Sequence, residues 1–335
     1  MRQPKNKQKY QSGSSKLVSL VVTVLVLSLC IVAAINKQNI RDWWVLRNYQ
    51  APANISTIAD EIALTDNSRK VFYVNKPEIT NSQAFTQACQ SKAQEKTIVL
   101  GCYHGNQFGI FILDVTDPRL QGVEQVTAGH ELLHAAYDRL TSSERSRIDK
   151  LLSDYYLTIK DQRIIETIEA YKQSEPNDLV NEMHSIFGTE IPNLPPELEQ
   201  YYSKYFKDRS AIVGFSQKYQ SEFTNRKNKI ASADSQLAVY KKQIDSQENG
   251  LQQQLATIDA QEAQMNQLKA SGNYESYNAM VTPYNNLIYS YNAKINSLQR
   301  LIDKHNNLVN ERNAIVLEES QLIQNLQPQA KRINN

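Results

Sequence analysis

Hydrophobic residues are arranged along this chain in three different patterns, and the first is a run of 19 residues without a charge, Leu17 to Ile35. As an α-helix this run measures about 28 Å, which is enough to cross the hydrocarbon core of a bilayer. Five basic residues and no acidic one lie in residues 1–16. This flank predicts a basic cytoplasmic tail at 1–16, a transmembrane signal-anchor helix at 17–35 and an extracytoplasmic location for the rest. The alternative is a cleaved signal peptide, with Ala33 and Ala34 as a weak small-residue site, although the run exceeds the usual apolar length of a signal.

The second pattern mixes helical and strand periodicities over residues 51–215, after a juxtamembrane linker at 36–50. The expected helices are Ile55–Leu64, a helix opened by the capping box Thr141–Glu144, a stretch at 164–173, and a long helix from Pro196 or Glu197. The expected strands are Lys70–Asn75, which Pro77 ends, and two runs within Thr97–Leu113 that join at His104–Asn106 as a hairpin. This segment is long enough for one α+β domain with a single core. The run Phe108–Leu113 is either an edge strand to which a peptide could add or a central buried strand.

The third pattern is a heptad repeat over residues 216–326, before a tail at 327–335. Apolar residues recur every seventh position from Ile230 to Met265 and again from Met280 to Ile323, with Ser271-Gly272-Asn273 between the two series. Such a repeat with a short break predicts an antiparallel coiled-coil helical hairpin. Pro283 should kink or delay the second helix. A polar seam at Gln247, Gln254 and Gln261 leaves two interpretations, a surface for a protein partner or self-association, and a rigid spacer.

Charge and cysteine content narrow the functional classes. The whole chain carries a net charge of +2 and residues 1–16 carry five positive charges, so the remainder carries −3. No basic patch or glycine-rich phosphate loop indicates nucleic acid or nucleotide as a ligand. Cys30 lies in the apolar run, and Cys89 and Cys102 are the other two cysteines. In an oxidising compartment this pair is expected to form a disulfide, and two buried free thiols are the alternative.

The segment His130-Glu131-Leu132-Leu133-His134 contains the residues with the clearest chemistry. Residues four apart lie on the same face of a helix, so His130 and His134 can bind one metal ion while Glu131 acts beside it as a general base. Apart from Glu131, the stretch Thr127–Ala136 has no charged residue. A helix that buries a metal site needs this composition, because an unpaired charge there would cost several kcal/mol. The alternative is a surface helix that happens to carry two histidines.

A catalytic zinc site needs a third protein ligand. The downstream candidates are Asp178, Glu182, His184 and Glu190, and a short helix is expected from Asp178 to Gly188. Glu182 is the preferred ligand. His184 is the second choice, and otherwise either a donor to a developing oxyanion or a histidine without a role.

Both motifs resemble those of a known enzyme family. Thr127–Ala136 resembles the extended HExxH signature of the zincin metallopeptidases, and Asn181–Gly188 resembles the glutamate-bearing helix of the gluzincins, in which an Asn-Glu pair precedes an Ile-Phe-Gly ending. Here that ending lies one residue closer to the glutamate, and Ile186 replaces the family's aspartate, so the partner of the first histidine must come from elsewhere. The resemblance implies an α+β zincin-like metallopeptidase domain with Zn²⁺ bound by His130, His134 and Glu182.

These patterns together predict a membrane-anchored zinc peptidase. Its catalytic residues would be Glu131 as base and His184 as oxyanion donor, and its substrate a peptide or protein outside the cytoplasm. The alternative is a non-catalytic adaptor of the cell envelope, which acts through its coiled coil and has a structural or vestigial zinc site. Glu131 favours the enzyme, because a purely structural site needs no base.

Overall fold

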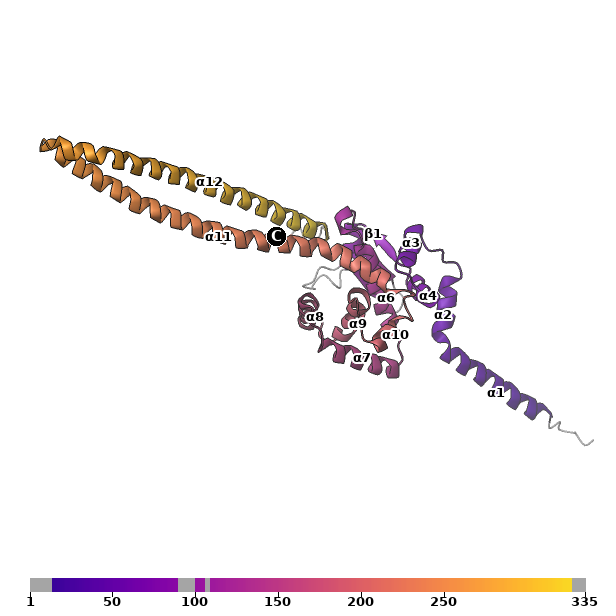
Figure 1. The fold of residues 1–335 in the computed structure, drawn as a ribbon. Coiled ribbons are helices and arrows are strands. Elements are labelled where there is room, and N and C mark those ends of the chain that lie inside the picture. The colour runs from indigo at the N-terminus through magenta and orange to yellow at the C-terminus, as the bar shows by residue number, and fades with distance from the viewer. Residues whose placement is uncertain (1–13, 90–99, 106–108, 327–335) are drawn as a thin grey trace, which may run out of the picture. The chain divides into compact units, whose positions relative to one another are not determined.

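The structure, a computed structural model, describes residues 14–89, 100–105 and 109–326, most of which are helical (Figure 1). The chain divides into two compact units. The first comprises Met1–Asp114 and Glu124–Gly214, and the second comprises Val115–Val123 and Phe215–Ile333. The first unit contains the apolar helix, the sheet and both motifs singled out in the sequence. The second contains the long hairpin.

The apolar run forms α1 (Ser14–Ile35), and none of its window Val18–Ile35 is buried by the protein. Its apolar side chains are exposed along the whole window, for example Leu29 at 67% and Ile35 at 76%. Lipid can cover such a surface favourably, whereas water cannot. The helix is therefore suited to a membrane anchor, and a signal sequence has the same properties.

Three helices follow, α2 (Lys37–Leu46), α3 (Ala53–Glu61) and α4 (Asp66–Val74). The predicted helix over Ile55–Leu64 is confirmed by α3, but the predicted strand over Lys70–Asn75 is wrong, because these residues belong to α4 and its end. The Thr65 hydroxyl accepts a hydrogen bond from the amide of Ser68 and so caps α4. Ser68, Val71 and Phe72 are buried at the spacing of one helix face. The cap and this face outweigh the strand propensity of Val71-Phe72-Tyr73-Val74.

A three-stranded sheet consists of β1 (Glu78–Thr80), β2 (Gly101–His104) and β3 (Gly109–Leu113) in the order β1-β3-β2. β2 and β3 pair antiparallel, with His104 opposite Gly109, so the predicted hairpin is confirmed, although its turn at Asn106 lies outside the described residues. β1 pairs parallel with β3. Phe108 lies outside the described residues, and the rest of the predicted run Phe108–Leu113 forms the central, largely buried strand, one of the two interpretations. Among the described strands, β2 is an edge strand.

Cys89 and Cys102 form a disulfide, as the sequence predicts. Cys89 follows α5 (Ser82–Ala88) as its C-cap, and Cys102 lies in β2. Both are buried. A closed loop of this length stabilises a fold by about 3 kcal/mol in the chain-entropy model. The bond therefore fixes the edge strand to α5.

Five helices complete the first unit: α6 (Val123–Tyr137), α7 (Ser142–Tyr156), α8 (Gln162–Ser174), α9 (Leu179–Glu190) and α10 (Pro196–Tyr202). The capping box at Thr141 and Glu144 is present, and α8 confirms the helix expected at 164–173. α9 packs against both α7 and α8. Nearly every residue of α9 is buried, so it is the central helix of this group.

The long helix expected from Pro196 begins later, at Arg209. α10 ends at Tyr202, and a turn separates it from α11 (Arg209–Ala270). The buried Arg209 guanidinium donates to the carbonyl oxygens of Ile191 at 2.6 Å and Pro192 at 3.1 Å, and it is paired with Glu199. One arginine thus ties the end of α9 to α10, which a continuous helix from Pro196 would not allow.

α11 and α12 (Tyr274–Leu326) form the antiparallel hairpin that the heptads predict (Figure 1). Gly272 adopts φ +75° in the turn between them, where a side chain would be strained. Leu251, Ile258 and Met265 are buried along the seam of α11. Pro283 lies inside α12 and does not delay its start. In the polar seam, Gln254 is buried, donates to the Leu287 carbonyl at 3.1 Å and accepts from Lys294 at 2.7 Å.

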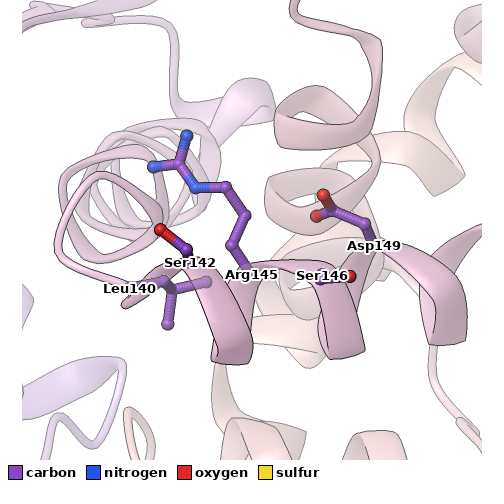
Figure 2. A pocket seen from close by; sticks show the side chains of 5 residues that line it. All are labelled: Leu140, Ser142, Arg145, Ser146 and Asp149. Carbon is purple, nitrogen blue, oxygen red and sulfur yellow. The ribbon is translucent and has the colours of Figure 1, made fainter.

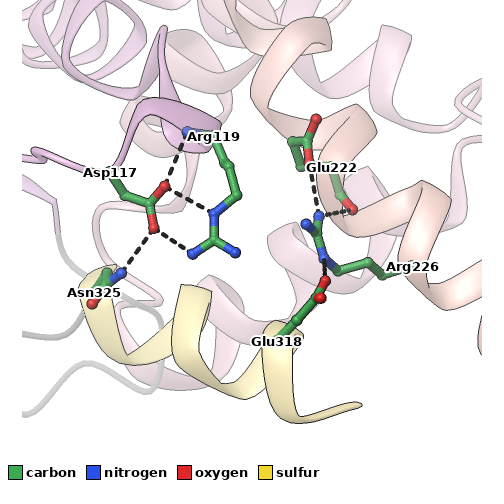
Figure 3. Close-up of polar contacts among 6 residues, drawn as sticks. All are labelled: Asp117, Arg119, Glu222, Arg226, Glu318 and Asn325. Carbon is green, nitrogen blue, oxygen red and sulfur yellow. Dashed lines mark hydrogen bonds and ion pairs between the residues drawn. The ribbon is translucent and has the colours of Figure 1, made fainter. Parts of the chain in front are cut away.

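Polar contacts hold the open end of the hairpin to the segment Val115–Val123 (Figure 3). Asp117 accepts from Arg119 at 2.7 Å and from Asn325 of α12 at 2.9 Å. The Arg119 guanidinium holds the pKa of Asp117 well below its usual range. Arg226 of α11 pairs with Glu222 at 2.8 Å and lies 3.7 Å from Glu318 of α12.

Thiol chemistry tests the disulfide. On the intact chain, a thiol reagent under denaturing conditions should label Cys30 alone, and adding a reductant first should expose Cys89 and Cys102. Cys102→Ser should lower the free energy of unfolding of the first unit by about 3 kcal/mol. Cys30→Ser is the matched control and should leave that free energy unchanged. Labelling of all three cysteines without reductant would contradict the pairing.

Candidate metal centre

α6 places the two histidines of the HExxH segment on one side, one turn apart. The rings of His130 and His134 lie 4.7 Å apart between centroids. On the other sides of this helix Ala128, Leu132 and Leu133 are fully buried. The near absence of charge in Thr127–Ala136 is therefore required by packing, because every residue of this stretch except His130 is buried.

α9 brings Glu182 to these histidines. One carboxylate oxygen lies 3.4 Å from Nε2 of His130, and the other lies 3.5 Å from Nε2 of His134. The three side chains offer ligand atoms that all lie within 4.8 Å of one another, so this group could hold a metal ion. Glu182 is 2% exposed, and a buried carboxylate needs a cation or hydrogen-bond donors around it. Both imidazoles present a nitrogen to it.

Gly188 allows α9 to approach α6 closely. The sequence predicts that this glycine ends the helix, but α9 continues through it to Glu190. A Cβ atom at this position would lie 2.5 Å from a methyl group of Leu133 and 2.7 Å from the ring of Tyr202. Leu133 is the neighbour of His134, so the contact lies beside the metal ligands. This requirement follows from the crossing of two helices, which no local pattern reveals.

Glu131, the next residue after His130, packs against the edge strand β2. It is 6% exposed. A Cβ atom at Gly101 of β2 would meet Oε1 of Glu131 at 2.6 Å and its Cγ at 2.8 Å. Only glycine leaves room for the carboxylate here. Sequence analysis missed Gly101 as a residue of the site. The available signal was a glycine in a predicted strand, because such a glycine often marks the close approach of another group.

His184 lies in the core and faces away from solvent. It has no exposed surface, and its Nε2 is 2.9 Å from the hydroxyl of Tyr201. Tyr202 donates to its backbone carbonyl at 2.7 Å. Burial, together with the nearby His134 and His130, lowers the pKa of His184 to about 3, so the ring is neutral. The structure groups His184 with tyrosines of α10 rather than with the three candidate ligands.

The remaining candidate ligands have other contacts. Glu190 accepts from Arg163 at 2.6 Å. Asp178 accepts from the side-chain amide of Asn181 at 3.1 Å. A second acidic group, Glu175, Asp178 and Glu182, shares Glu182 with the first. Only the group with both histidines offers the nitrogen donors that transition metals favour.

The expected outer partner of a histidine ligand is not found for His134. A metal-binding imidazole ordinarily donates its other N–H to a carboxylate or carbonyl. Nδ1 of His134 is buried and has no hydrogen-bond partner in the described part of the chain.

No family model matches this chain, and no curated protein or solved structure is similar to it at a significant level. The chemistry of the site therefore rests on its own residues. Two imidazoles and one carboxylate, held together by two helices and largely buried, form a group that could bind a divalent transition metal.

Replacement of Gly188 tests the helix crossing. Gly188→Ala should lower the free energy of unfolding by about 1–3 kcal/mol, because the ring of Tyr202 cannot move away easily. It should also weaken metal binding, measured by titration with Zn²⁺, since α9 carries Glu182. Gly250→Ala in α11, where the added methyl meets nothing within 4 Å, is the control and should be neutral or stabilising by up to about 1 kcal/mol.

A second prediction tests the ligand assignment on α9. Glu182→Gln keeps the size of the side chain but removes the charge, so metal content measured by mass spectrometry of the purified chain should fall by at least about tenfold. Glu190→Gln, the same change eight residues along α9, should retain the metal. Retention by Glu182→Gln together with loss by Glu190→Gln would overturn the assignment.

Proposed function

We propose that this chain is a zinc-dependent peptidase with a zincin-like domain, anchored by α1 so that the domain lies outside the cytoplasm. The group of His130, His134 and Glu182 supports this proposal, because two imidazoles and one carboxylate are a ligand set of catalytic zinc sites. The position of Glu131 supports it further, since a structural site needs no carboxylate beside it. The substrate would be a peptide or protein.

Zinc fits the three ligands better than calcium or magnesium, which prefer oxygen donors. Three protein ligands leave a fourth coordination position open. A bound zinc ion supplies a Lewis acid that makes water acidic near neutral pH and polarises a peptide carbonyl. Glu131 then accepts the proton of the attacking water and delivers it to the leaving amine. His130, His134 and Glu182 would hold the zinc ion.

The observation that carries the proposal is the contact of Glu131 with the edge strand. Its carboxylate lies against Gly101 of β2, and β2 has one side that no described strand pairs with. An extended peptide that adds to this side would form backbone hydrogen bonds along the strand. The peptide would thereby run past Glu131 and the metal ligands together. Hydrolysis of an extended peptide requires a general base, metal ligands and a strand edge that lie close together.

His184 enters this proposal as a positioning residue. Its ring is enclosed and bonded to Tyr201, so it does not donate to a substrate oxyanion in this arrangement. It anchors the middle of α9 to α10, two residues after Glu182. Its role is then to hold the carboxylate ligand in place.

The second candidate function is an adaptor that binds a partner through the hairpin. Exposed apolar side chains on α11 and α12 favour it, among them Val239 at 53%, Leu255 at 43% and Leu317 at 61% exposure. Single apolar residues on a surface are common, however, and do not by themselves mark an interface. The two functions differ in whether Glu131 matters.

Glu131→Gln separates the enzyme from the adaptor. The amide keeps the shape of the side chain but cannot accept the water proton, so hydrolysis of a fluorogenic peptide library should fall by about 10² or more while metal content and melting temperature persist. Glu124→Gln, the same change near the start of α6, is the control and should keep full activity.

Equal peptidase activity of Glu131→Gln and the unaltered chain would exclude the proposed mechanism. The adaptor would be favoured if, in addition, envelope phenotypes followed deletion of residues 225–326 and ignored Glu131.

A further inference from the structure

A cleft of about 780 Å³ lies beside α2, bounded by α4, the end of α6, the start of α7 and the turn after α10. Its lining begins at Gln38, three residues after Ile35 at the end of the apolar helix. Three residues span at most about 11 Å, whatever their conformation. If α1 crosses the membrane, the end of the cleft at Gln38 is confined to the depth of the lipid headgroups or just above them.

The charge of the cleft is positive. Four basic side chains and two acidic ones line it. Arg139 donates to both oxygens of Asp42, at 2.7 and 3.1 Å, and Lys204 lies 3.9 Å from Glu144, so these charges are matched in pairs. The remaining two are Arg47 and Lys70, both exposed. Among the described residues that line the cleft, no further acidic side chain balances them.

Aromatic residues on α2 add a second observation. Trp43 and Trp44 are 61% and 63% exposed, and the Arg47 guanidinium lies over both rings, at 5.9 and 5.4 Å from their centroids. Tryptophan favours the boundary between lipid and water, where its apolar ring and its N–H are both accommodated. Trp43 also lines the cleft. Exposed indoles directly after an apolar helix would be unfavourable in water alone.

A second pocket of this unit has its charged groups bound within the protein. It measures about 350 Å³ and is lined by α7 residues with Leu140 (Figure 2). Its Arg145 donates to the Tyr137 carbonyl at 2.9 Å and lies over the Tyr137 ring, and its Asp149 accepts from the Tyr137 hydroxyl at 2.7 Å. Both of its charged groups are therefore held by hydrogen bonds within the protein.

We propose that the cleft beside α2 binds the phosphate-bearing headgroup of an anionic phospholipid, with Lys70 and Arg47 facing the headgroup and Trp43 in the interface. This proposal rests on α1 remaining as a membrane anchor, and it does not depend on peptidase activity. The paired Asp42 and Arg139 would hold α2 in place as one wall, since Arg139 follows the end of the metal-bearing helix α6. A lipid in this cleft would thus contact the same unit that contains His130, His134 and Glu182.

Native mass spectrometry of the full chain tests the proposal. The chain is placed in nanodiscs with equal phosphatidylglycerol and phosphatidylcholine, extracted with mild detergent, and measured for retained lipid. We expect retention of phosphatidylglycerol over phosphatidylcholine. Lys70→Gln should reduce that retention at least about fivefold, whereas Lys150→Gln, the same change on the exposed face of α7, should not. Each side chain is exposed, so neither change should affect folding.

The fluorescence of Trp43 and Trp44 can locate the bound lipid, because the chain has no other tryptophan. In Trp44→Phe, the emission of Trp43 should shift when phosphatidylglycerol replaces phosphatidylcholine in the discs, and Lys70→Gln should remove the shift. In Trp43→Phe, the emission of Trp44, which does not line the cleft, should respond less.

Equal retention of both lipids, or equal loss in Lys70→Gln and Lys150→Gln, would overturn the proposal. So would displacement of the lipid by millimolar inorganic phosphate, which would identify a site for the free anion instead. A mature N-terminus near residue 35 would remove the anchor on which the proposal rests. Loss of peptide hydrolysis in Glu131→Gln bears on the proposed enzyme alone.

Discussion

The burial of one carboxylate governs the arrangement of the first unit. Glu182 is 2% exposed and lies between two imidazole nitrogens at 3.4 and 3.5 Å. A buried charge is costly by several kcal/mol unless an opposite charge or donors surround it, so α9 can hold this residue in the core only where α6 supplies the histidines. A metal ion between the three side chains would satisfy this requirement better than neutral imidazoles would. The close approach of the two helices, through Gly188, follows from it.

The surroundings of α9 keep this approach fixed from several directions. Tyr201 and Tyr202 of α10 bond the ring and the backbone of His184, and Arg209 ties the end of α9 to α10. On the other side, the edge strand β2 presents Gly101 to Glu131, and a disulfide holds that strand to α5. Each contact joins two different elements of the fold, 10 to 30 residues apart in sequence. The proposed base and two of the proposed ligands lie on α6, and the third ligand lies on α9. The edge strand that packs against the base is fixed by a covalent bond.

The stability of the hairpin has a different source, namely contacts that are repeated along two neighbouring helices. Its seam is closed by apolar residues at heptad spacing, and the buried Gln254 bonds Lys294 and the Leu287 carbonyl across it. A buried polar residue of this kind favours one register over others. At its open end, Asp117, Arg119 and Asn325 join the hairpin to the short segment that leads into α6. The contacts that stabilise the second unit thus do not involve His130, His134 or Glu182, which belong to the first unit.

The sequence alone determined those features whose signal is local and periodic. The apolar helix, the two heptad helices with their glycine turn, the capping box of α7 and the spacing of His130 and His134 all follow from the geometry of a single helix. The cysteine pair was foreseeable because only two cysteines lie outside α1. Tertiary structure decided the rest. It made residues 70–75 helical against their strand propensity, made β3 central and β2 the edge, and ended α10 before the long helix. It also brought Glu182, rather than His184 or Glu190, next to His130 and His134. Which polar residue of one helix meets another helix depends on packing between segments more than forty residues apart, and no local pattern contains that information.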